Sequence, residues 1–187
     1  MTFLLLCGCS RVPEKLLIME ANFHHSRGMH TEAISSYQQA REHEEAAPYS
    51  EFGLGSAYFA LGEEKAALKR FAEAGKLLES HSPDSHRELR YRIHYNTGVV
   101  LFSEGDFSGA VDSFRKALKT DGGKKDAKRN LELSIQSLAR EHKADGNKNK
   151  DENESMNILF QYVRQKEFNQ WKSRQWEQEE DIYGLDY

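Results

Sequence analysis

Three stretches of the chain carry the same set of small and aromatic residues at the same internal spacing. Each begins with a glycine, followed by an alanine five residues on, an aromatic residue four later and a second alanine three later. The sets are Gly28, Ala33, Tyr37 and Ala40; Gly62, Ala67, Phe71 and Ala74; and Gly105, Ala110, Phe114 and Ala117. A pattern that recurs at a period of about 20–50 residues marks folds built by stacking one small unit on the next. The spacing therefore predicts a stack of similar units.

Each unit is predicted to be a pair of helices joined by a turn at its glycine. Upstream of the glycines, apolar and small residues also keep a helical spacing, as do Leu54, Gly55 and Tyr58 in the second unit. The chain has three prolines, is rich in residues that favour helix, and shows almost no alternation with the period of a strand. Glycine adopts a positive φ at little cost, which suits the sharp turn between two helices. We therefore expect an all-α fold.

The units are 34 or 43 residues apart when each is counted from fourteen residues before its turn glycine. They begin at Glu14, Pro48 and Tyr91, and a half unit begins at Lys125. This pattern resembles the tetratricopeptide repeat, a helix–turn–helix unit of about 34 residues whose small residues let its two helices approach closely. The resemblance covers residues 14–140. It implies an α-α superhelix, a solenoid of about three repeats whose first helices line a concave groove.

The resemblance also divides the chain into segments. The repeats are expected at residues 14–47, 48–82 and 91–124, and a capping helix is expected at 125–142. Together these segments form one domain over residues 14–142. Nine extra residues precede the third repeat, where Ser82 or Ser85 is expected to cap an overlong first helix. Residues 143–154 are almost entirely polar and predict a solvated linker. Residues 155–178 have the pattern of an amphipathic helix, and residues 179–187 form an acidic tail.

The first nine residues, MTFLLLCGC, contain both cysteines of the chain. A disulfide framework is therefore excluded from the rest of the protein. The apolar run followed by Leu6, Cys7, Gly8 and Cys9 resembles the end of a bacterial lipoprotein signal, which predicts lipidation of Cys9 and a position on the periplasmic side of a membrane. The alternative is an apolar N-terminus in a cytoplasmic protein. No other segment is apolar enough to span a bilayer.

The charge of the chain argues against a nucleic-acid partner. The formal net charge is −4, and acidic and basic residues are intermixed along the sequence. Proteins that bind DNA or RNA gather lysine and arginine on one surface to neutralise phosphates. We therefore expect no nucleic-acid binding.

The sequence contains no recognisable catalytic or cofactor-binding motif. Nucleophile elbows, phosphate loops and dinucleotide fingerprints are all missing from it. We therefore predict a protein that is not an enzyme and needs no cofactor. Its eight histidines include His24 and His25, whose side chains diverge by about 100° on a helix, while His30 lies across the turn. A metal or small-ligand site built from these histidines is retained as a minor hypothesis.

One face of each first helix is predicted to line the concave groove. The resemblance to tetratricopeptide repeats implies which positions of each first helix face the groove, and because these positions are three and four residues apart they share one helical face. The predicted groove residues are Asn22, His25, Tyr49, Phe52, Phe59, Arg92, Tyr95, Asn96 and Phe102. Aromatic side chains exposed in a row usually mark a binding surface. The alternative is that some of them pack against neighbouring helices or against the chain's own C-terminal helix.

The order of segments resembles a second, narrower family. A short repeat array, a helix with the letters AKRNLEL from Ala127, a polar linker and the segment RQKEFNQWKSR from Arg164 are similar to the tetratricopeptide proteins of bacterial aerotolerance (Bat) operons. That resemblance implies association with a membrane protein that carries a von Willebrand A domain.

Two principal functions follow from these patterns. The first is a lipid-anchored scaffold that binds a segment of a partner protein in an aromatic groove. The second is a structural protein that assembles with copies of itself through residues 155–187.

Overall fold

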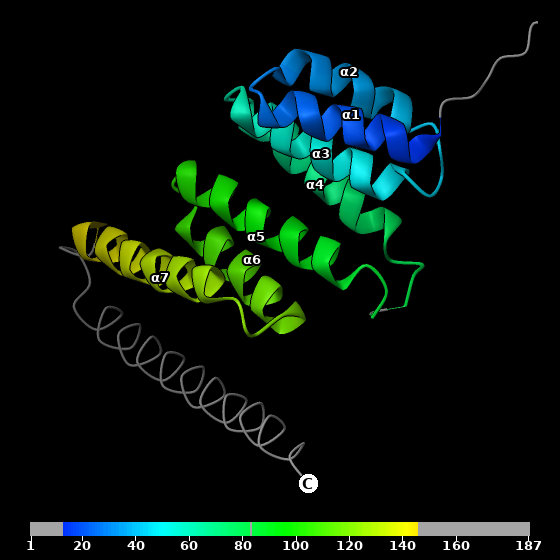
Figure 1. Ribbon diagram of the computed structural model, residues 1–187. Helices are drawn as coiled ribbons and strands as arrows, with labels where there is room; N and C mark the ends of the chain where they lie inside the picture. Colours follow the sequence, from blue (N-terminus) through cyan, green and yellow to red (C-terminus); the bar gives the residue numbers. More distant parts are fainter. Residues whose placement is uncertain (1–12, 83, 146–187) are drawn as a thin grey trace, which may run out of the picture.

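The computed structural model describes residues 13–82 and 84–145, and within them it contains helices and no strand (Figure 1). The helices are α1 (Glu14–Ser26), α2 (His30–Ala40), α3 (Ala47–Ala60), α4 (Glu64–Leu77), α5 (Arg87–Ser103), α6 (Phe107–Thr120) and α7 (Lys125–Asp145). The predicted all-α fold is confirmed. The predicted lipidation site and the segments at 146–154, 155–178 and 179–187 lie outside the described residues.

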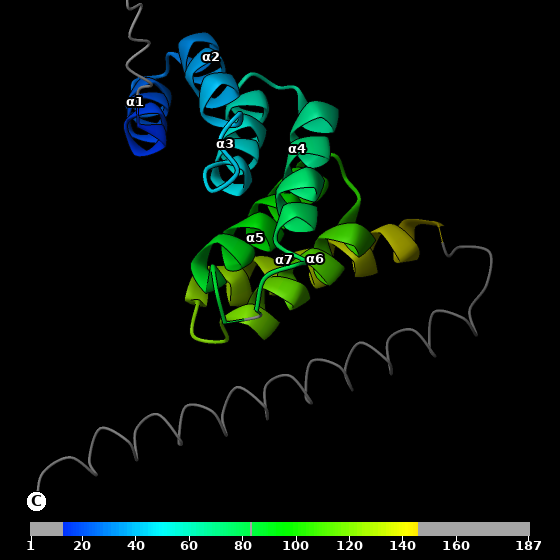
Figure 2. The ribbon, with the colours of Figure 1, turned by 90° about the vertical axis from the view of Figure 1, so that its right-hand side faces the viewer.

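Consecutive helices pack as antiparallel pairs, and each pair packs on the next. We call α1, α3 and α5 the A helices and α2, α4 and α6 the B helices. Each A helix contacts the A helix of the next pair, and α5 contacts α7, whereas the described residues show no contact between successive B helices. The array therefore bends with its A helices on the inner, concave side, as the views in Figures 1 and 2 show. This arrangement is the predicted solenoid.

The turn within each pair is closed by a glycine in the left-handed region. Gly28, Gly62 and Gly105 have φ values of 77°, 76° and 83°. A side chain at this φ would be strained, because its Cβ would crowd the backbone. The predicted role of the three turn glycines is confirmed.

Two further glycines let aromatic rings of the B helices lie directly on the A helices. A Cβ added to Gly55 would lie 2.5 Å from the Phe71 ring, and one added to Gly98 would lie 2.8 Å from the Phe114 ring. Both rings are almost fully buried, at 1% exposure. The close approach of A and B helices therefore depends on the absence of a side chain at these two positions.

The core follows the joints of the array as a row of three clusters. They are centred on Tyr37 and Leu54, on Phe71 and Ile93, and on Phe114 and Leu131. The last cluster includes residues of α7, so this helix covers the apolar face of the third pair. Stability in such an array comes from each pair and its interface with the next.

Two helix boundaries differ from those predicted. Helix α5 begins at Arg87, and neither Ser82 nor Ser85 caps it, because the residue before the helix is His86 in a left-handed conformation with φ of 55°. Helix α5 is still the longest A helix, with 17 residues. Helix α7 continues to Asp145 and so includes the first residues of the predicted linker.

Candidate functional site

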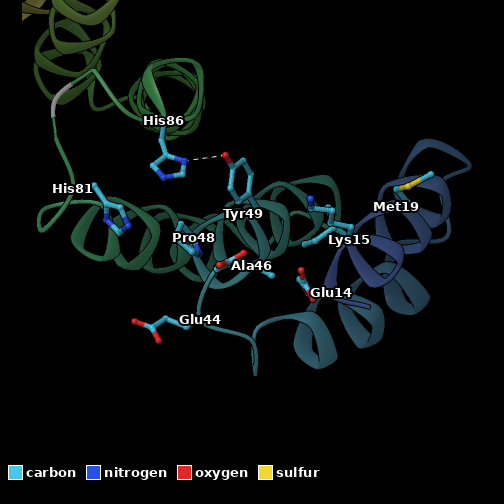
Figure 3. A pocket seen from close by; sticks show the side chains of 11 residues that line it. Glu14, Lys15, Met19, Glu44, Ala46, Pro48, Tyr49, His81 and His86 are labelled. Carbon is cyan, nitrogen blue, oxygen red and sulfur yellow. Dashed lines mark hydrogen bonds between the residues drawn. The ribbon is translucent and has the colours of Figure 1, made fainter. Parts of the chain in front are cut away.

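A cavity of about 690 Å³ lies where the N-terminal ends of the three A helices converge (Figure 3). Its walls come from α1, from the connection between α2 and α3 together with the first turn of α3, and from the connection between α4 and α5. The lining residues are Glu14, Lys15, Ile18, Met19, Glu44, Glu45, Ala46, Pro48, Tyr49, His81 and His86. We call this space the A-helix cavity. Its volume falls within the range of about 300–1,000 Å³ that is common for ligand pockets.

The sequence explains how α1 and α3 supply the apolar part of the cavity. On α1, Lys15, Ile18 and Met19 are three and four residues apart and therefore share one face. On α3, Pro48 occupies the first turn, where its missing N–H costs nothing, and it brings Tyr49 to the start of the helix. Met19 is 64% exposed and Tyr49 is 41% exposed. Large apolar side chains therefore line a space that remains open to solvent.

The third wall is held by His86. The Tyr49 hydroxyl and His86 Nδ1 lie 2.9 Å apart, and the two side chains point toward one another in Figure 3. The His81 ring packs edge-on against His86 with 5.1 Å between the ring centroids. The left-handed backbone of His86 costs about 1–2 kcal/mol for a residue other than glycine. The hydrogen bond to Tyr49 and the ring contact are two interactions that oppose this cost.

Arg90 fixes the connection that carries the two histidines. Its guanidinium donates to the backbone carbonyl oxygens of Leu78, His81 and Ser85. These bonds satisfy carbonyl groups at the end of α4 and in the loop that follows, where helical partners are missing. The loop is thereby held at the mouth of the cavity.

The rim of the A-helix cavity is acidic. Glu14, Glu44 and Glu45 line it together with a single lysine, Lys15. None of the ion pairs within residues 13–82 and 84–145 engages these three glutamates. The cavity thus combines an apolar floor with a rim that favours cationic groups.

A second cavity, of about 400 Å³, lies between α4, α5 and α6. It includes His94 of α5, with Arg90 on the same helix and Lys116 on α6. Burial lowers the pKa of His94 below its usual value, and the charges of Lys116 and Arg90 lower it further. Burial and these two cations therefore favour the neutral form of His94.

The predicted groove residues do not all meet in one place. Tyr49 lies in the A-helix cavity. Asn22 is exposed, and its Oδ1 accepts a hydrogen bond of 2.7 Å from the Tyr37 hydroxyl. Burial raises the pKa of Tyr37 to about 12, so the hydroxyl remains a donor at neutral pH. Asn22 therefore already serves the contact between α1 and α2.

His25 lies beside His30, with 3.2 Å between the two Nδ1 atoms. Burial lowers the pKa of His25, and His30 lowers it further. His24 points elsewhere, toward Phe23, with 6.1 Å between their ring centroids. Within residues 13–82 and 84–145, no three His, Cys, Asp or Glu side chains form a group that could hold a metal ion.

The other predicted aromatics are half-buried within the joints of the array. Phe52 packs against Phe71, with 5.7 Å between ring centroids, and Phe59 joins the same cluster. Tyr95 stacks on Tyr91 and accepts a hydrogen bond from Asn130 of α7. Phe102 packs against Phe107 and lines a cavity of about 80 Å³ beside α7. The expected row of exposed aromatics is thus reduced to Tyr49.

The two polar groove residues of α5 also lie apart from the A-helix cavity. Arg92 is exposed and pairs with Glu88 at 2.8 Å, and Asn96 is half-buried.

Sequence reasoning missed most of the A-helix cavity. Met19, Pro48, His81 and His86 were absent from the predicted groove, as were the glutamates of the rim. The signal that could have found the histidines is the nine-residue insertion before the third repeat, because it lengthens the chain next to Tyr49. The left-handed conformation of His86 has no signature in the sequence.

This geometry defines a helical-repeat solenoid with a binding-sized cavity on its concave side. Residues 74–125 match the tetratricopeptide repeat family. The predicted resemblance to this repeat is thereby confirmed for that part of the chain. A region of 112 residues is 30% identical to the transcription activator GutR of Bacillus subtilis (strain 168). The alignment spans 58% of this chain and 13% of the length of that relative.

Solved structures show the same fold. The first tetratricopeptide domain of Spaghetti (RPAP3), bound to the HSP90 peptide SRMEEVD, is 21% identical with a TM-score of 0.58, over 67% of this chain and 93% of that one. The Sgt2 domain from Aspergillus fumigatus is 21% identical with a TM-score of 0.61, over 71% and 83%. MamA is 18% identical with a TM-score of 0.58, over 94% and 79%. The likeness establishes a fold of the tetratricopeptide type.

Proposed function

We propose that this protein is a non-enzymatic scaffold that binds a segment of a partner protein in the A-helix cavity. The observation that carries the proposal is the convergence of three A helices on one space of about 690 Å³ with a floor of exposed apolar side chains. The cavity walls are set by packing and by the bonds of Arg90 and His86, so the receptor loses little entropy when a partner binds. The similar structure of RPAP3 with a bound peptide shows that this fold accommodates a peptide in that protein.

Site-specific photocrosslinking tests the proposal. A photoreactive phenylalanine analogue at Met19 lies in the cavity, and the same analogue at Leu61 is a matched control on an exposed apolar position outside it. We expect a discrete crosslinked partner from the Met19 position, and we expect the crosslink to be lost when Ile18 is changed to glutamate. Equal crosslinking from Leu61, or a crosslink that survives Ile18→Glu, contradicts the proposal.

We further propose that the protein is lipidated at Cys9 and held on the periplasmic side of a bacterial membrane. The support is the MTFLLLCGC sequence, since two or more acyl chains hold a protein on a bilayer stably. Among residues 13–82 and 84–145, none of the helices is long and apolar enough to cross a bilayer. Mass spectrometry of the N-terminal peptide distinguishes a diacylated Cys9 from an unmodified Met1.

The partner proposed from the resemblance to the Bat-operon proteins is a membrane protein with a von Willebrand A domain. The support is the order of the repeat array, the AKRNLEL letters in α7 and the segment from Arg164. Identification of the Met19 crosslink by peptide sequencing tests it directly. A crosslinked protein without such a domain would leave the scaffold function standing and remove this partner.

A further inference from the structure

The acidic rim of the A-helix cavity favours a basic binding segment. Its rim carries three glutamates and one lysine around an apolar floor, and the glutamates have no ion-pair partner in the described part of the chain. An acidic peptide would be repelled by this rim. A segment that alternates large apolar side chains with lysine and arginine would fit both its floor and its rim.

This chain contains such a segment. Between residues 155 and 176 the basic residues are Arg164, Lys166, Lys172 and Arg174, and Glu167 is the one acidic residue. Six of the apolar residues in the segment form one broad helical face, and they are Met156, Leu159, Phe160, Val163, Phe168 and Trp171. The overall charge of the protein is −4, so a basic stretch of this length stands out against the rest of the chain.

We propose that residues 156–174 dock intramolecularly in the A-helix cavity, with apolar side chains on its floor and basic side chains at its rim. A volume of about 690 Å³ receives a few large side chains but not a whole helix. The segment therefore lies across the mouth and inserts one face, in the manner of helix-in-groove recognition.

The chain is long enough for this contact. Helix α7 ends at Asp145, at the end of the array opposite the N-termini of the A helices (Figure 1). The return distance is about one helix length, or about 25–30 Å, plus about 20 Å across two helix spacings. The ten residues from 146 to 155 span up to about 35 Å when extended, and the docking segment adds its own length. A tethered segment also has a high effective concentration, which favours docking within one molecule.

The two tryptophans of the chain, Trp171 and Trp176, provide a direct measurement, since neither lies in the described array. In the full-length Trp176→Phe protein, Trp171 is the single tryptophan. We expect its emission to be shifted to shorter wavelength and its quenching by acrylamide to be reduced severalfold relative to the urea-unfolded chain. Both effects should be independent of protein concentration, with a monomeric mass by light scattering.

Variants of the cavity then locate the contact. Met19→Glu adds a charge to the floor at an exposed position, and the pair Glu44→Lys and Glu45→Lys reverses the rim. We expect both to restore the quenching of Trp171, while Leu61→Glu, at another exposed apolar position that lies outside the cavity, leaves it protected. Far-UV circular dichroism confirms that each variant folds.

Three outcomes overturn the proposal. They are full exposure of Trp171 in the parent protein, equal protection in the Met19 and Leu61 variants, and protection that disappears on dilution as a dimer dissociates. The last result would assign the contact to a second copy. The two tests are distinguishable, because protection of Trp171 reports docking of the tail, whereas a Met19 crosslink to a second protein reports binding of a partner.

Discussion

The Tyr49 hydroxyl lies 2.9 Å from Nδ1 of His86, and this contact joins the first turn of α3 to the residue that precedes α5. The two rings also meet edge to face, with 5.7 Å between their centroids. The contact closes one side of the A-helix cavity and links the second helix pair to the third. It lies where the nine extra residues enter the repeat pattern.

Tyr49→Phe is expected to lower the free energy of unfolding by no more than about 1 kcal/mol, because it removes one neutral hydrogen bond between exposed groups. Urea denaturation measures the change. The substitution keeps the ring, so the apolar floor is retained and the crosslink from Met19 should persist. A loss of several kcal/mol would show that the third helix pair depends on this bond for its position.

Glu51 of α3 is a buried carboxylate that forms two ion pairs. It is 3% exposed and pairs with Arg41 at 3.3 Å and with Arg70 at 3.2 Å, so it connects α3 with the end of α2 and with α4. Glu51→Gln should lower the free energy of unfolding by about 1.5–3 kcal/mol, because two charge-assisted bonds lose their negative partner.

The control is Glu88→Gln, since Glu88 also pairs with two cations, Arg92 and Lys124, but is exposed. Exposed ion pairs contribute little, and we expect a loss below about 1 kcal/mol. Equal losses in the Glu51 and Glu88 variants, measured by urea denaturation, would contradict the role given to burial.

Gly55→Ala should destabilise the protein by about 1–3 kcal/mol, because the new Cβ would lie 2.5 Å from a buried phenylalanine ring. Gly75→Ala in α4 is the matched control, where a Cβ meets only Ile93 at an ordinary distance of 3.9 Å. There the substitution should stabilise the helix by about 0.5–1 kcal/mol. Thermal and urea unfolding of the two variants should therefore shift in opposite directions, and a shared direction would refute the steric account.

Stability should fall as the pH drops below the usual histidine pKa of 6.5. In the folded protein burial lowers the pKa of His94. The unfolded state therefore binds more protons in this range, and the free energy of unfolding decreases as the pH falls. The groups around His94 are Arg90 and Thr97 of α5, Ser113 and Lys116 of α6, Lys76 of α4 and Glu79 in the turn that follows α4.

His94→Gln removes this titration and should flatten the change in unfolding free energy between about pH 7.5 and pH 5.5. His25 also has a lowered pKa and contributes in the same direction, so some dependence remains. An unchanged slope in the His94 variant would show that other groups dominate acid sensitivity.

The fold was predictable because it is encoded in local features. The residue type of the turn glycines alone indicates a positive φ. Within the third unit, the Phe114 ring packs on α5 at Gly98, which has no side chain. Helix α7 was also predicted, as a capping helix at 125–142, and its Leu131 and Ile135 pack on the third pair. Each of these features depends on residues within one unit or its neighbour.

The candidate site was less predictable, because it depends on contacts between units and on one unusual backbone conformation. Phe52 and Tyr95 were predicted on the concave face, yet their rings pack against Phe71 of α4 and Phe114 of α6. Helical spacing specifies the direction in which a side chain leaves its own helix. It does not specify how closely a neighbouring helix packs over that side chain. The position of His86 depends on a φ that the sequence does not indicate.

The unequal contacts of A and B helices have a mechanical consequence. Successive A helices touch, whereas the described B helices do not contact one another. The contacts between A helices can therefore act as a hinge line. Bending about this line changes the distance between successive B helices. Tension along the array would straighten it and change the separation of α1 from the connection that precedes α5, and these two segments form walls of the A-helix cavity.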